Sequence, residues 1–310
     1  MNELFSSFLK KYKDKKLVIA THRSCDADGI ASMYALSKVL KNPTIALQDK
    51  PSDDTKPLIE RLQMAYYQLS DLKKEDYDGL IVVDTNSYHL IKDAKNWKII
   101  LLIDHHELES KDISAEFEII NDKAPSNVEI IYDLIEKMDE TTAFALGVGI
   151  ISDTARFKNS DPETFEKISK LIKLSNSTYE ELFKYAYPRE PIDRRQAILI
   201  AMQRIEFIEY KGYLIATSHI GINESQTSTI LSDVCDFVFI SSEKHHETRT
   251  SARASQHMII PMNQVMLEVG KRLNGVGGGH EKAAGCTVKI DYKTVLRECI
   301  SVLKEFIDKE

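Results

Sequence analysis

Short aliphatic runs alternate with longer segments of helical periodicity along the first half of the chain. Each run is rich in branched side chains and bounded by polar residues, which predicts a strand buried on both faces. Helices are predicted between the runs, over Ala27–Leu40 and Lys56–Leu69. This alternation indicates βαβ units and a mostly parallel sheet covered on both faces. The predicted strands are Leu17–Thr21, Thr44–Leu47, Leu80–Asp84 and Ile99–Asp104.

Three more helices are predicted after these strands. The segment Ser126–Glu129 is typical of a capping box and would open a helix over Asn127–Met138. Asp161, followed by proline, marks the start of another helix. The third is predicted over Thr141–Ile151 and would deliver Asp153 at its end.

The hydrophobic pattern changes near Tyr187–Pro191, and 310 residues is about twice the usual length of one domain. We therefore expect a first domain over residues 1–188, a linker helix region over 189–211 and a smaller α+β domain over 212–310. The linker helix is predicted from about Arg194 to Glu209. The last domain is expected to contain strands at Tyr213–His219, Asp236–Ser241 and Thr248–Ala254, a helix at Pro261–Leu273 and a glycine-rich run at Gly275–Gly279.

The composition is that of a globular protein, with 43% hydrophobic and 29% charged residues. A net charge of −7 argues against binding of long nucleic acid, which needs a broad basic surface, but allows a small anionic substrate. The four cysteines are scattered without a C-x-x-C spacing, which indicates neither a disulfide framework nor a zinc site. We see no signal peptide or membrane-spanning run and expect a soluble cytoplasmic protein without a membrane partner.

Side chains that can bind metal ions follow three predicted strands and one predicted helix. Taken singly, each could be a helix cap or a loop carboxylate. Because the carboxyl ends of parallel strands meet at one edge of a sheet, we expect these side chains to converge. Convergence of this kind suits a binuclear site, and imidazole with carboxylates suits Mn²⁺. The candidates are His22, Asp26, Asp28, Asp84, Asp104, His105, His106 and Asp153.

A glycine-rich segment of the second domain, Gly277–Gly285, contains His280 and a run of small residues. Consecutive backbone N–H groups in such a loop can face an anion, and small residues let another backbone come close. The alternative is a simple turn before a strand at Cys286–Ile290. The glycine triplet is a weak signal alone and gains weight from the metal-ligand candidates.

Together these residues resemble the motifs of the DHH phosphoesterase superfamily. Gly277–Gly285 is similar to the GGGH signature of its DHHA1 subgroup, and the match runs in order over nearly the whole chain. The length is that of the two-domain branch of nanoRNases and pAp phosphatases. The resemblance implies an N-terminal, mostly parallel sheet with flanking helices, a smaller C-terminal α+β domain and a cleft between them. The four motifs correspond to His22-x₃-Asp26-x-Asp28, Asp84, Asp104-His105-His106 and Asp153.

The resemblance also implies a role for each residue. The metal ions would be two Mn²⁺, with Mg²⁺ and Co²⁺ as alternatives. One would be held by His22, Asp26 and Asp84, and the other by Asp28, Asp84, His105 and Asp153. Asp104 would orient the histidines, and His106 would contact the scissile phosphate. Substrate phosphate would be bound by Arg253, Gly278, Gly279 and His280.

We therefore predict a phosphodiesterase that cleaves oligonucleotides of about two to five nucleotides to 5′-mononucleotides, with two bound ions activating a water. It could also dephosphorylate 3′-phosphoadenosine 5′-phosphate. One alternative is a phosphodiesterase of cyclic di-AMP or of its linear product, which would share the metal site. Another is a non-catalytic nucleotide-binding sensor. An inorganic pyrophosphatase is disfavoured by the GGGH segment. Association into a homodimer is the expected protein partnership.

Two other features have ordinary interpretations. His245 and His246 are expected on a connection between strands, where they would be solvated. Cys25 lies among the first ligand candidates, at a place where the family commonly has proline, and is expected to be an inert buried thiol.

Overall fold

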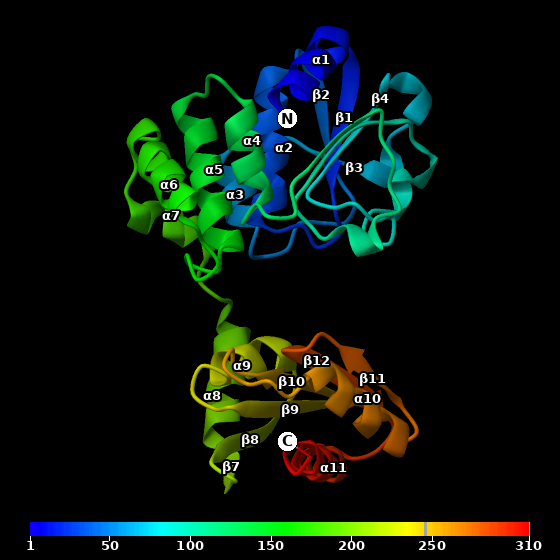
Figure 1. Ribbon diagram of the computed structural model, residues 1–310, viewed down its shortest axis with the longest axis vertical. Helices are drawn as coiled ribbons and strands as arrows, with labels where there is room; N and C mark the ends of the chain where they lie inside the picture. Colours follow the sequence, from blue (N-terminus) through cyan, green and yellow to red (C-terminus); the bar gives the residue numbers. More distant parts are fainter. Residues whose placement is uncertain (245–246, 310) are drawn as a thin grey trace. The chain divides into compact units, whose positions relative to one another are not determined.

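The computed structural model describes residues 1–244 and 247–309 and divides into two compact units, Met1–Arg189 and Glu190–Glu310 (Figure 1). His245 and His246, which we expected to be solvated, lie outside the described residues. The expected linker, residues 189–211, contains a helix and a strand that belong to the second unit. In the described part of the chain, no helix has both the length and the apolar character needed to cross a bilayer.

The first unit is built on a six-stranded sheet in which every ladder is parallel. The order β3-β2-β1-β4-β5-β6 places the most apolar strands side by side in the middle. Their side chains are almost all buried, as unbroken aliphatic runs predict. The strands are β1 (Lys16–Thr21), β2 (Asn42–Leu47), β3 (Tyr67–Gln68), β4 (Gly79–Val83), β5 (Ile99–Asp104) and β6 (Phe117–Ile120).

The α-helices of this unit contribute their apolar side chains to a single core on one face of the sheet. The opposite face is covered by loops and short 3-10 turns at Leu69–Asp71 and Lys92–Asn96. The helices are α1 (Asn2–Tyr12), α2 (Ala27–Val39), α3 (Lys56–Arg61), α4 (Asn127–Leu134), α5 (Glu140–Asp153), α6 (Pro162–Leu174) and α7 (Tyr179–Ala186).

Two helices of the first unit are shorter than predicted. The helix expected over Lys56–Leu69 ends at Arg61, because Gln63 adopts a left-handed φ of 49° that α-helix cannot continue through. The helix expected to reach Met138 ends at Leu134, where the chain turns to an extended conformation. In both cases the hydrophobic periodicity continues beyond the residue at which the backbone leaves the helical conformation, so the predicted helix was too long.

The second unit has a mixed six-stranded sheet in the order β11-β12-β10-β9-β8-β7. Among the described strands of this second sheet, only β8 and β9 pair in parallel, and the other ladders are antiparallel. The strands are β7 (Glu206–Tyr210), β8 (Tyr213–Ile220), β9 (Phe237–Lys244), β10 (Glu247–Ala254), β11 (Val276–Gly279) and β12 (Ala283–Val288). The helices are α8 (Ile192–Gln203), α9 (Glu224–Leu231), α10 (Met262–Arg272) and α11 (Tyr292–Ile307).

The two faces of this sheet carry different helices. α10 and α11 share a core with Phe237 and Phe239 of β9, whereas α8 and α9 share a core with Val238 and Ile240 of the same strand. Alternation along β9 therefore separates the faces.

Two predictions for the second unit are wrong. The helix expected to reach Glu209 ends at Gln203, and Glu206–Tyr210 is the edge strand β7. The expected glycine loop is also regular structure, because Gly277, Gly278 and Gly279 belong to β11 and pair with β12.

Gly277 lies where β11 packs against α10, so a Cβ atom there would clash with the carbonyl oxygen of Met266. We expect Gly277→Ala to lower the free energy of unfolding by about 1–3 kcal/mol, because backbone must move to admit the methyl group. Gly221→Ala is the matched control: no heavy atom lies within 4 Å of the point that its methyl group would occupy. Urea unfolding of both variants checks this, and equal destabilisation would contradict the packing role.

Candidate metal centre

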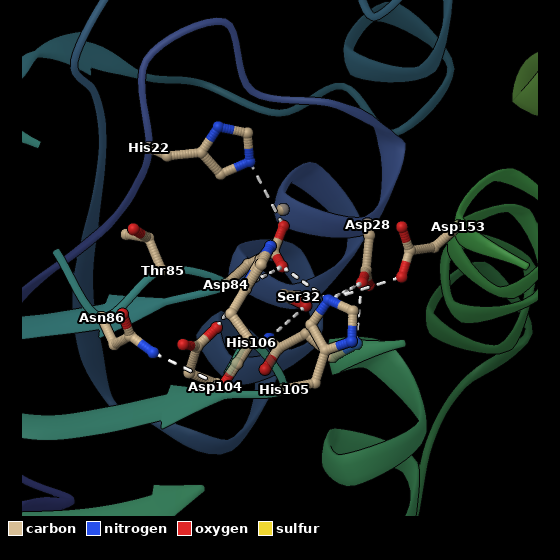
Figure 2. A network of polar contacts seen from close by, with 12 residues as sticks. His22, Asp28, Ser32, Asp84, Thr85, Asn86, Asp104, His105, His106 and Asp153 are labelled. Atoms are coloured by element: carbon tan, nitrogen blue, oxygen red, sulfur yellow. Dashed lines mark hydrogen bonds and ion pairs between the residues drawn. The ribbon is translucent and has the colours of Figure 1, made fainter. Parts of the chain in front are cut away.

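The predicted ligands gather at the carboxyl ends of three neighbouring strands. Because β1, β4 and β5 are adjacent, the residues that follow them, His22, Asp84 and His105, meet at one edge of the sheet. α2 begins at this edge and supplies Asp28, and α5 ends there and supplies Asp153. Figure 2 shows these side chains directed toward one another.

Asp84 lies at the centre of this cluster, with a side chain only 2% exposed. Its Oδ2 atom is 3.3 Å from Nε2 of His22, and its Oδ1 atom is 3.4 Å from Nε2 of His105. The residue has a left-handed φ of 59°. Such a conformation costs a non-glycine residue about 1–3 kcal/mol and is found mainly where function requires it. Each carboxylate oxygen thus faces a different imidazole.

Both histidines present the same nitrogen to the carboxylates. The Nδ1 atom of His22 lies 2.7 Å from the carbonyl oxygen of Arg23, and that of His105 lies 3.2 Å from the carbonyl oxygen of Ala124. Each carbonyl accepts a hydrogen bond from Nδ1–H, which assigns the Nε2 lone pair to a ligand. Burial by itself lowers the pKa of these rings, but Asp84 outweighs it and raises the pKa to about 9 for His22 and about 10 for His105.

Two further carboxylates, those of Asp28 and Asp26, accept hydrogen bonds from helix N-termini. Asp28 is buried and accepts hydrogen bonds from the backbone N–H groups of Asn127 (2.7 Å) and Val128 (2.8 Å), at the start of α4. Asp26 caps α2 by accepting from the N–H groups of Asp28 and Gly29. The capping and ligand interpretations of Asp26 are therefore compatible, since a carboxylate has lone pairs for both.

The capping box predicted for α4 does not form. The Ser126 hydroxyl donates to the Glu129 carboxylate at 3.4 Å and makes no bond to a helix N–H group. Asp28, about 100 residues earlier in the chain, takes the place of the local cap. Local sequence could not reveal this, because the capping residue comes from α2.

Asp28 and Asp153 lie among other carboxylates, and the neighbouring positive charges do not offset the cost of ionising them. Burial, together with the charges of Asp84 and Asp153, raises the pKa of Asp28. Burial raises the pKa of Asp153 to about 7. The buried Oδ2 atom of Asp84 accepts no hydrogen bond from the described residues. Buried carboxylates in this state are stabilised by cations, so the donor set fits divalent metal ions.

Three overlapping groups of side chains have ligand atoms within 4.8 Å of one another. Asp84 is shared by two groups and His105 by two. All six ligands expected from the sequence are among them. The groups are His22, Asp26 and Asp84; Asp28, His105 and Asp153; and Asp84, His105 and His106.

His106 differs from His105 in its surroundings. Its Nδ1 atom donates to Oδ1 of fully buried Asp104 at 2.8 Å, and its side chain is 49% exposed. The hydrogen bond to Asp104 raises the pKa of His106. Asn86, which sequence reasoning missed, donates to the carbonyl oxygens of His106 and Glu107 and fixes the loop (Figure 2).

The turn after Asp153 carries a feature that no sequence signal reveals. Ala155, Arg156 and Phe157 all have left-handed φ angles, of 49°, 63° and 67°. The Arg156 guanidinium lies 4.4 Å from the centroid of the Tyr187 ring, and the Tyr187 hydroxyl donates to the carbonyl oxygen of Ser152 at 3.2 Å. These contacts hold the end of α5, and with it Asp153, against α7.

Cys25 is buried, and burial raises the pKa of its thiol to about 12. The thiol is therefore protonated at neutral pH and unreactive, as expected. The four cysteines are all buried and free.

The predicted substrate-binding residues lie in the second unit. Arg253 is in β10, opposite Val238 of β9, and therefore on the α8–α9 face of the sheet. Its Nε atom is buried and donates no hydrogen bond to the described residues. Gly278 has open space at its Cβ position, whereas Gly279 packs on the backbone of β12. His280 follows directly, at the turn between these strands.

Family models match both units of the chain. The model of the DHH family, N-terminal domain, matches residues 16–155, and the model of the DHHA1 domain matches residues 212–309. An uncharacterized protein of Methanocaldococcus jannaschii is 28% identical, and the alignment covers 97% of both chains. A membrane protein–ribosomal subunit fusion of Aster yellows witches'-broom phytoplasma is 22% identical, over 96% of this chain and 37% of the relative.

Among solved structures, an exopolyphosphatase-related protein from Bacteroides fragilis has a TM-score of 0.75 at 18% sequence identity. The similarity covers 100% of this chain and 96% of that one. The two proteins share a fold.

We expect Mn²⁺ to raise the unfolding temperature of the protein, because an ion that binds only the folded state stabilises it. Asp84→Asn should abolish this rise, since it removes the carboxylate shared by two ligand groups. Without metal, the variant should be less stable than the parent at neutral pH, because it loses the pairing with His22 and His105 that outweighs burial and lowers the pKa of Asp84 to about 2. Calorimetry with Mn²⁺ and with chelator checks this. The control is Asp76→Asn, at an exposed turn; an unchanged Mn²⁺ effect in Asp84→Asn would refute the site.

Proposed function

The chain belongs to the DHH phosphoesterase superfamily, and from this membership and the geometry of the Asp84 cluster we propose that it hydrolyses very short oligonucleotides to 5′-mononucleotides. We propose Mn²⁺ as the ion and a phosphodiester as the bond cleaved. The proposed function is thus that of a nanoRNase, a nuclease whose substrates are very short oligonucleotides.

One observation carries this proposal: Asp84 directs one oxygen toward His22 and the other toward His105. These two imidazoles never share a group of possible ligands. A carboxylate shared in this way between two groups suits a pair of ions that it bridges. A single structural ion would need only one of the groups.

Two divalent ions, when bound, supply the Lewis acidity that activates water near neutral pH and neutralises the phosphoryl charge. His22 and Asp26 would hold one of them, and Asp28, His105 and Asp153 the other, with Asp84 in common. His106 is held by Asp104 through Nδ1, which leaves Nε2 to carry a proton to the leaving oxygen. Its exposure makes it accessible to a substrate.

The second unit would grip the phosphate groups of the substrate. Arg253 suits this role because its Nε–H is desolvated without a partner, and a phosphate oxygen would satisfy it. Gly278, with its open position, lies in β11, and His280 lies at the turn into β12, the strand that pairs with Arg253's strand β10. A grip of this size needs only local positive charge, which agrees with a chain of net charge −7.

The proposal is tested with end-labelled RNAs of two to seven nucleotides in Mn²⁺, beside cyclic di-AMP and inorganic polyphosphate. We expect cleavage of the shortest RNAs to 5′-mononucleotides and no detectable turnover by Asp84→Asn, because the shared ligand is lost. Asp76→Asn should retain full turnover. Preference for the cyclic dinucleotide, or turnover by Asp84→Asn, would overturn the assignment.

Asp104→Asn probes the positioning of His106. An amide can donate to Nδ1 and thereby favour the wrong tautomer of the ring, so we expect turnover to fall about 10–100-fold. The amount of Mn²⁺ bound per chain should not change, because Asp104 is in none of the ligand groups among the described residues. Steady-state kinetics and metal analysis of the same preparation check this; parallel loss of metal would make Asp104 a ligand instead.

A further inference from the structure

A second polar pocket lies in the C-terminal unit and contains none of the predicted substrate-binding residues. It has a volume of about 480 Å³ and opens between the end of β8 and the first turns of α11. Its polar lining comes from four elements: the end of α8, β7, β8 and α11. The polar and aromatic side chains that define its chemistry are Arg204, Glu206, His219, Tyr292, Lys293 and Arg297.

The pocket is on the face of the sheet opposite Arg253. His219 pairs with Ser241 two residues after Thr217 pairs with Phe239, which is in the α10–α11 core. His219 is therefore on the α10–α11 face. Arg253 pairs with Val238 and is on the other face. No single small molecule can contact both across a sheet, so this is a separate site.

The charge of the pocket is strongly positive for a protein with an excess of acidic residues. Three cationic side chains, those of Arg204, Lys293 and Arg297, line the pocket together with one carboxylate, that of Glu206. The chain as a whole has more acidic than basic residues, 48 against 41. The pocket has the opposite balance, with three basic residues and one acidic residue. A concave cationic surface concentrates anions.

Hydrogen bonds organise these donors. Arg204 Nη1 lies 3.3 Å from His219 Nε2 and donates to the carbonyl oxygen of His219 at 3.4 Å. Burial and the positive charges of Arg204 and Lys293 lower the pKa of His219, so the ring is neutral. A neutral ring that accepts at Nε2 carries its proton on Nδ1, which adds another donor.

The pocket is also lined by aromatic and apolar side chains of α11. The Tyr292 ring stacks on His219 with centroids 4.1 Å apart and planes 18° from parallel. Leu296 and Ile300, on the same side of α11, continue the wall. A site that combines several cationic donors with aromatic and apolar side chains matches a phosphate ester of a planar or sugar group. Its volume lies in the range of small-ligand pockets.

We propose that this pocket is a second binding site, specific for a phosphate ester of mononucleotide size, with the phosphate at Arg204, Lys293 and Arg297. The site uses none of the metal-ligand candidates and none of the predicted substrate-binding residues Arg253, Gly278, Gly279 and His280, so it stands independently of the proposed hydrolysis.

Titration calorimetry of the full chain with 5′-AMP in the presence of chelator tests the proposal. We expect AMP to bind the parent protein, and binding to persist in Arg253→Ala, in which any contribution of the Arg253 face is removed. The double variant Lys293→Ala/Arg297→Ala should bind at least tenfold more weakly, since two charge-assisted contacts are lost. The charge-conserving double variant Lys293→Arg/Arg297→Lys should bind within a fewfold of the parent. Lys271→Ala, at an exposed position of α10, is the matched charge control.

Three results would overturn the site: no binding of AMP to the parent at millimolar concentration, loss of binding in Arg253→Ala, or unchanged binding in Lys293→Ala/Arg297→Ala. Adenosine and inorganic phosphate serve as partial ligands. Each should bind more weakly than AMP, because each lacks one half of the recognised chemistry. Equal binding of adenosine and AMP would also refute the assignment. Urea unfolding confirms that the variants are folded.

Discussion

The mutual repulsion of buried carboxylates at the end of β4 is the constraint on which the first unit depends. Asp28 and Asp84 are buried at the same edge with Asp153 beside them, and the sheet, α2 and α5 hold them there. Burying charge costs several kcal/mol per ion unless an opposite charge accompanies it. Without a metal ion, protonated His22 and His105 supply part of that charge, and as metal ligands they would be neutral. The negative charge that remains makes the cluster a candidate cation site, and the parallel sheet, α2 and α5 hold its side chains close together.

Much of this site could be predicted because its residues follow directly from strand ends. β1, β4 and β5 are unbroken aliphatic runs, and a buried parallel strand leaves its next polar residue at one known edge. What could not be predicted depends on contacts distant in sequence. The local cap expected at Ser126 is replaced by Asp28, and Gln63 ends α3 through its backbone conformation. Neither outcome has a signature in the neighbouring residues.

The second unit shows how alternation separates two chemistries on one sheet. Neighbouring residues of β9 and β10 point to opposite faces, so Arg253 and the core residue Ala252 belong to different environments. The segment Glu206–Tyr210, which we expected to be helical, matters here, because as strand β7 it completes the edge that borders the His219 pocket. The helical pattern of the preceding residues extended the prediction over this strand, because its mostly exposed side chains do not show the alternation of hydrophobic and polar residues that predicts a strand. In β11, Gly277 allows close packing against α10, which is a structural role that requires no ligand.

The bonds that Asp28 accepts from Asn127 and Val128 also constrain the order of folding. They join positions about 100 residues apart, so the carboxylate reaches its final orientation only after β1, β4 and β5 have assembled and α4 has docked. Contacts of such sequence separation carry a large loop-closure cost and form late. A nascent chain that has completed only its first strands and α2 therefore offers His22 and Asp26 but not the full ligand set. Metal ions bound by the full ligand set would therefore bind tightly only to molecules whose first unit has finished folding.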